Sequence, residues 1–123
     1  MPNPQKEAEN KLTKGLLDFI VLQILKHQPM HGYQIILRIR QTYGIYFGPS
    51  TIYPLLGVLE TKGYLISEWD LTAQRPRKVY QITNEGSEAL NFAEKSLNHI
   101  CKKLTSQTQG QPDEPQVLVF DQP

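Results

Sequence analysis

Apolar residues recur at helical spacing in three successive stretches of the chain. The stretches cover residues 11–27, 31–43 and 50–62, and a proline or a glycine closes each of them. Each stretch places several apolar side chains on one face, which is the pattern of a helix that packs in a core. The sequence therefore predicts three helices that share one hydrophobic core.

Two short segments of β-type composition follow the third helix. They cover Tyr64–Trp69 and Lys78–Thr83, and the segment between them, Asp70–Arg77, is polar and contains a proline. This pattern predicts a β-hairpin. A fourth helix is expected from about residue 85 to residue 105, capped by Thr83 or its neighbour and acidic in its first turn.

In this order the elements predict a mainly α fold with a small β-hairpin wing, which is a winged helix-turn-helix domain. We assign this domain to residues 11–84 and the last helix, 85–105, to dimerisation. Residues 1–10 are polar and interrupted by prolines, so we expect a flexible arm. Residues 106–123 lack Lys and Arg, and we expect a disordered acidic tail whose β-prone segment 116–120 could dock on another surface.

The residue types that carry metal or covalent chemistry are sparse. Cys101 is the single cysteine, which excludes an intrachain disulfide framework, and the three histidines show no metal-ligand spacing. No glycine-rich phosphate loop, acid pair or nucleophile–base pair stands out, so we expect no enzyme, cofactor or metal site. The longest apolar run, Gly15–Leu25, is about 11 residues, too short to span a bilayer. No signal peptide opens the chain, and we expect a cytoplasmic protein.

Charge is distributed unevenly along the chain, although the net charge is only +1. Residues 11–83 contain nine Lys and Arg against four Asp and Glu, whereas the remainder contains four against eight. A basic domain with acidic ends favours a nucleic-acid partner, because phosphates attract the basic part. Chance scatter of surface charge is the alternative at this point.

The third helix and the hairpin tip carry the residues that we predict to bind DNA. The early positions of the third helix that lie off its apolar face are uncharged hydrogen-bonding residues: Ser50, Thr51 and Tyr53. We expect Ser50 also to cap this helix. The tip carries three cations that suit a phosphate clamp: Arg75, Arg77 and Lys78. A solvated charged turn is the alternative for the tip.

Four motifs occur in one order and spacing. They are HGY at 31–33, STIYPLL at 50–56, LExxGYL at 59–65 and PRKxYxITxxG at 76–86. Together they resemble the PadR family of winged-helix transcription regulators, and the resemblance covers about residues 16–86. Two features depart from the family pattern. A single helix follows the wing, as in the shorter subgroup, and Trp69 lies on a wing strand rather than on that helix, which argues against drug binding between tryptophans.

The resemblance implies a homodimeric repressor on a pseudo-palindromic operator in double-stranded DNA, often released by a small aromatic or hydrophobic effector. It implies DNA contacts from Tyr33, Thr51, Tyr53, Arg77 and Lys78. For Tyr33 or Tyr53 alone, partial packing in the core stays open. For the whole chain, the alternative function is a winged helix used purely for contact with another protein.

Apolar residues of the fourth helix step by three and four residues, as in a coiled-coil seam: Leu90, Ala93, Leu97, Ile100 and Leu104. We predict that this stripe faces a second copy of the chain. Two heptads are too short to hold a dimer alone, so we expect Leu12 and Leu16 of the first helix to pack against the partner. The alternative is that the stripe folds back on its own domain.

Overall fold

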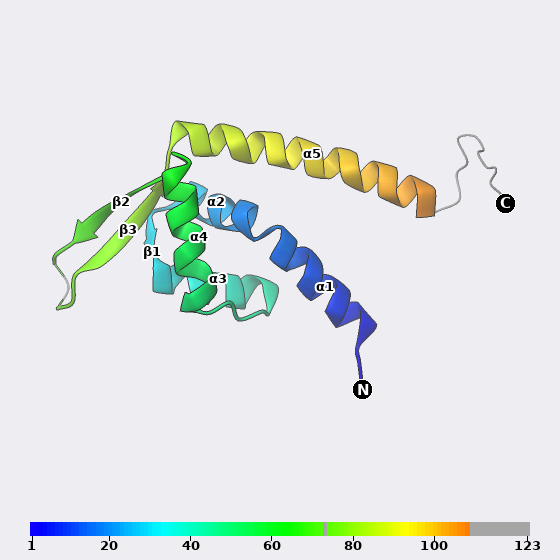
Figure 1. Ribbon diagram of the computed structural model, residues 1–123, viewed down its shortest axis with the longest axis horizontal. Helices are drawn as coiled ribbons and strands as arrows, with labels where there is room; N and C mark the ends of the chain where they lie inside the picture. The colour runs from blue at the N-terminus through cyan, green and yellow to red at the C-terminus, as the bar shows by residue number, and fades with distance from the viewer. Residues whose placement is uncertain (73, 109–123) are drawn as a thin grey trace. The chain divides into compact units, whose positions relative to one another are not determined.

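The computed structural model describes residues 1–72 and 74–108 (Figure 1). Its elements in chain order are α1 (Pro4–Gly15), α2 (Leu17–His27), β1 (Met30–His31), α3 (Gly32–Tyr43), α4 (Pro49–Thr61), β2 (Leu65–Asp70), β3 (Arg77–Ile82) and α5 (Asn84–Thr108). The chain divides into two compact units at residues 90 and 91, and α5 contributes to both. The β-prone segment 116–120 and the predicted tail beyond residue 108 lie outside the described residues.

The hydrophobic core lies in the first unit and is built mainly by α2, α3 and α4. Helix α2 contributes six buried residues: Leu17, Ile20, Val21, Leu22, Ile24 and Leu25. Helices α3 and α4 each add a stripe of buried branched residues: Ile35, Ile36, Ile39, Ile52, Leu56 and Leu59. Full burial of one such side chain contributes about 1.5–3 kcal/mol, so the stripes fix which face of each helix points inward. The prediction of a mainly α winged fold is confirmed.

The N-terminal region differs from its prediction as an arm followed by one helix over residues 11–27. Helix α1 already begins at Pro4, because the side chain of Asn3 accepts a hydrogen bond from the backbone N–H of Lys6 at 3.2 Å and proline suits a first helical position. Most of the predicted arm, from Pro4 onward, is therefore helical. A break at Leu16, with φ −100° and ψ 9°, separates α1 from α2.

The sheet has three strands in the order β1-β3-β2, one more than the sequence predicted. Strand β1 pairs antiparallel with β3, so that Met30 lies opposite Tyr80 and His31 opposite Val79. A strand of two residues is too short to produce an alternating pattern, which explains why the sequence did not reveal it. Strand β1 ties the loop after α2 to the middle of β3.

The hairpin turns one face toward α4. Leu65 on this face is buried, and the hydroxyl of Ser67 donates a hydrogen bond of 2.6 Å to the carboxylate of Glu60 on α4. Alternation along β2 places Trp69 on the same face. Directly opposed residues of paired strands share a face, so Lys78, which lies opposite Trp69, is there too. In Figure 1 the outer part of the hairpin projects away from α2, α3 and α4.

Helix α5 starts at a cap that the sequence predicted. The hydroxyl of Thr83 accepts from the backbone N–H of Gly86 at 3.0 Å and donates to the carbonyl of Gly63 at 2.6 Å. The helix ends at Thr108, three residues beyond the predicted boundary. Leu90 is 2% exposed and belongs to the core of its own chain, so its assignment to the dimer interface is corrected.

Candidate nucleic-acid interface

Helix α4 exposes its N-terminal turns on the side away from the core. Its N-cap is Gly48, whose carbonyl accepts from the backbone N–H of Thr51 and of Ile52, both at 3.0 Å. Ser50 therefore lies inside the first turn and does not cap the helix, contrary to the prediction. Ser50 and Thr51 are exposed, whereas Ile52 is fully buried. The buried residue anchors α4 while its hydroxyl-bearing neighbours face solvent.

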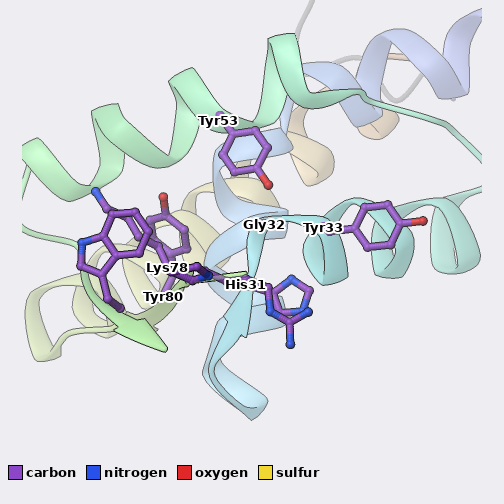
Figure 2. Close-up of a pocket in the computed structure, with 9 residues that line it drawn as sticks. His31, Gly32, Tyr33, Tyr53, Lys78 and Tyr80 are labelled. Carbon is purple, nitrogen blue, oxygen red and sulfur yellow. The ribbon is translucent and has the colours of Figure 1, made fainter. Parts of the chain in front are cut away.

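Tyr53 extends this exposed surface and also packs on α3. Its ring lies over the backbone of Gly32, where a Cβ atom would come within 2.5 Å of Cε1 and 2.7 Å of the hydroxyl oxygen. Figure 2 shows Tyr53 reaching from α4 toward Gly32. The side chain is 45% exposed, so it packs in part and remains accessible to a ligand. Glycine at position 32 is therefore a requirement of this contact.

The start of α3 is capped by His31. Its ring Nδ1 accepts from the backbone N–H of Gln34 at 3.4 Å, and the Gln34 side chain accepts from the His31 backbone N–H at 3.1 Å. Partial burial, and next the charge of Arg77, lower the pKa of His31 below 6.5, while Asp70 acts in the opposite direction. The neutral imidazole, which can accept at Nδ1, is thus the favoured form.

A pocket of about 310 Å³ opens between the start of α3, α4 and the hairpin (Figure 2). Its lining is largely aromatic and carries two cations: His31, Gly32, Tyr33, Tyr53, Trp69, Pro76, Arg77, Lys78 and Tyr80. Tyr80 points from β3 toward α4 in Figure 2, and burial, followed by the charge of Glu60, raises its pKa. Its hydroxyl therefore stays protonated at neutral pH and can donate a hydrogen bond.

The three predicted wing cations occupy different environments. Arg75 lies in the turn, whereas Arg77 is the first residue of β3 and lies opposite Asp70. Hydrogen bonds from the Thr72 hydroxyl and backbone N–H, at 2.6 and 3.0 Å, lower the pKa of Asp70, and Arg77 adds to that shift. Lys78 lies further along β3. The sequence prediction placed all three cations at the hairpin tip, whereas the structure places Arg77 and Lys78 on strand β3.

The structure brings four of the seven predicted DNA-binding residues around the pocket: Tyr33, Tyr53, Arg77 and Lys78. Tyr33 is 59% exposed, and in Figure 2 its hydroxyl points away from the hairpin. Ser50, Thr51 and Arg75 are exposed but do not line the pocket. Sequence reasoning did not assign Gly32, Trp69 or Tyr80 to this surface. The alternation of Leu65, Ser67 and Trp69 along β2 was the one available sign for Trp69.

The described residues add two further findings. No helix within residues 1–72 and 74–108 combines the length and the apolar character needed to cross a membrane. In the same part of the chain, no three His, Cys, Asp or Glu side chains gather where they could hold a metal ion.

Packed helices α2, α3 and α4, followed by a hairpin beside the exposed turns of α4, define a winged helix-turn-helix domain. The model of the transcriptional regulator PadR-like family matches residues 21–91. The chain therefore belongs to the PadR-like family of transcriptional regulators, which are DNA-binding regulators and not enzymes.

Individual proteins agree with this membership. Transcriptional regulator Rv3488 of Mycobacterium tuberculosis is 31% identical over 86 residues, which cover 68% of this chain and 79% of that protein. The crystal structure of a PadR family transcriptional regulator from Eggerthella lenta has a TM-score of 0.79 and 31% identity, covering 85% of this chain and 92% of that one. A PadR family transcription regulator from Clostridium difficile has a TM-score of 0.67 and 27% identity, covering 77% and 99%.

Proposed function

We propose that this chain is a homodimeric repressor that binds double-stranded DNA at a pseudo-palindromic operator. The observation that carries the proposal is the pocket in which exposed Tyr53 of α4 lies with Arg77 and Lys78 of the hairpin, beside the exposed N-terminal turns of α4. Release by a small aromatic or hydrophobic effector is part of the proposal and rests on the family resemblance alone.

Two parts of this surface have different tasks in the proposal. Ser50, Thr51 and Tyr53 enter a major groove, where hydroxyl groups can contact base edges or phosphate oxygens. Arg75 and Arg77 hold flanking phosphates, because long cationic side chains on a projecting hairpin suit the DNA backbone. Base choice thus belongs to α4, and most sequence-independent affinity belongs to the hairpin.

The second copy of the chain pairs through the exposed stripe of α5. Leu97 is 40% exposed and Ile100 is 58% exposed, and both lie on the heptad-like seam with Ala93 and Leu104. Leu12 of α1 is 65% exposed and adds apolar surface, whereas Leu16 is half-buried against its own core. Two-fold pairing would set the two α4 helices about one DNA turn apart, roughly 34 Å.

Selection of bound fragments from the source genome, followed by sequencing, tests the proposal. We expect enriched fragments to share an inverted repeat with half-sites one helical turn apart. On the best fragment, the logarithm of the binding constant should fall with the logarithm of salt concentration with a slope of about −4 to −5, because each protomer would neutralise two or three phosphates.

The alternative function, contact with another protein alone, makes the opposite prediction. A pure protein-binding module would enrich no fragment and would leave a heparin column at low salt without steep salt dependence. That pair of results would overturn the proposed function.

A further inference from the structure

Lys78 and Trp69 form a cross-strand pair at the outer edge of the pocket. They lie directly opposite each other in the β2–β3 register, and the Lys78 Nζ atom lies 5.6 Å from the centre of the Trp69 ring. That distance is within the range of a cation–π interaction, in which the ring face attracts the ammonium group. Both residues line the pocket with Tyr53 of α4.

The Trp69 ring restricts the side chain of Lys78, whereas a lysine at a hairpin tip would move freely in solvent. A lysine side chain has four rotatable bonds, and fixing it against a ligand costs conformational entropy. A ring that already holds the ammonium beside α4 reduces that cost when DNA arrives. Trp69 is 61% exposed, so packing in the hydrophobic core does not explain a large aromatic residue at this position.

We propose that Trp69 is a positioning residue for DNA binding, which holds the ammonium of Lys78 at the edge of the pocket so that it meets a DNA phosphate from there. This inference rests on the proposed function. It separates Lys78 from Arg75, which lies in the turn outside both strands. The indole contributes to affinity through Lys78 and not by touching DNA itself.

The test compares Trp69→Leu, Trp69→Phe and Lys78→Met on the operator at several salt concentrations. Trp69→Leu should weaken binding about two- to five-fold with little change in the salt slope, because the lysine keeps its charge. Trp69→Phe should restore most of the affinity, since phenylalanine also presents an aromatic face. Lys78→Met should reduce the slope by about one for each protomer. Ile66→Ala is the matched control, because Ile66 is 51% exposed on the opposite face of β2.

A double variant and a measurement without DNA complete the design. In the Lys78→Met background, Trp69→Leu should have no further effect, and an additive effect would overturn the positioning role in favour of direct contact. Trp69 is the single tryptophan, so its emission should change on Lys78→Met in the free protein. Unchanged emission overturns the inference. If the wild-type protein binds the operator and Trp69→Leu binds it with the same affinity, the inference is overturned. If the wild-type protein binds no DNA, it is the proposed function that is overturned.

Discussion

The ring of Tyr53 lies over Gly32, so that α4 touches the start of α3 at a position where a Cβ atom would collide with the ring as it is placed. A methyl group at position 32 would meet the end of the Tyr53 side chain, which is half exposed and can swing toward solvent. The contact therefore determines the position of the Tyr53 side chain and contributes little to the stability of the domain.

Gly32→Ala should displace Tyr53 and weaken operator binding about ten-fold, with a loss of unfolding free energy of only about 1 kcal/mol. Titration of labelled operator and thermal unfolding measure the two effects. Gly15→Ala is the control, because nothing lies within 4 Å of its Cβ position and alanine favours a helix. Wild-type affinity in Gly32→Ala would show that the position of Tyr53 does not matter to DNA.

Thr51→Ala should cost about 1–3 kcal/mol of binding free energy on the best site and relax preference at one or two base pairs. Thr51 is exposed at the N-terminal end of α4, the part that a recognition helix presents to base edges. Binding-site selection with the variant measures the change. Thr61→Ala, at the other end of the same helix, should leave the preference intact. Unchanged specificity in Thr51→Ala would restrict Thr51 to backbone contacts.

Replacing Arg75 and Arg77 with alanine should weaken binding to specific and random duplexes alike. The salt slope should fall by about two for each protomer, since each phosphate contact contributes about one. Lys6→Ala with Lys11→Ala is the control for charge, because both lysines are exposed on α1. An effect confined to the specific duplex would mean that the hairpin reads bases.

The stability of the domain should decrease as the pH falls below about 6.5, because His31 has a lowered pKa in the folded chain. Below pH 6.5 the unfolded chain binds a proton at His31 more readily than the folded chain does. The free energy of unfolding therefore falls as the pH drops from 6.5 toward the lower pKa of the folded chain. Above pH 6.5 His31 is neutral in both states, and its contribution to the stability of the folded chain is fully present. His31→Asn, which keeps a capping side chain but does not titrate, should flatten this part of the profile. Denaturant unfolding across pH 5 to 8 checks it, and an unchanged profile would exclude His31 as the source.

Leu97→Asp combined with Ile100→Asp should give a folded monomer that loses high-affinity operator binding. Both side chains are exposed in the single chain, so charges at these positions would act on the partner contact and leave the core intact. Light scattering measures the mass, and circular dichroism checks the fold. A wild-type protein that is monomeric at tens of micromolar would contradict the dimer and the palindromic operator together.

The sequence predicted those parts of the fold in which many residues repeat one pattern. The stripes of α3 and α4 and the alternation of the hairpin each follow from several apolar positions. Single local contacts were missed for the opposite reason. The Asn3 cap that starts α1, the pairing of Met30 with Tyr80, and the capping role of His31 each depend on one or two residues.

The same difference holds for the candidate site. The exposed positions of α4 could be predicted from its apolar stripe, because helical periodicity that identifies the buried face also identifies the residues that face solvent. The Gly32–Tyr53 contact joins two helices, and only the tertiary arrangement brings them together. The Trp69–Lys78 pair depends on the register of the two hairpin strands, which the sequence pattern did not predict.

The pairing of β1 with β3 makes His31 part of two structures, because it lies opposite Val79 in the sheet and also caps α3. A ladder of two residues is too short to be stable alone, so β1 depends both on the capped helix and on its pairing with the middle of β3. Backbone amides of β1 and of the first turn of α3 should therefore exchange with deuterated solvent through one shared opening event. Amides near the hairpin turn should exchange faster and independently of that event.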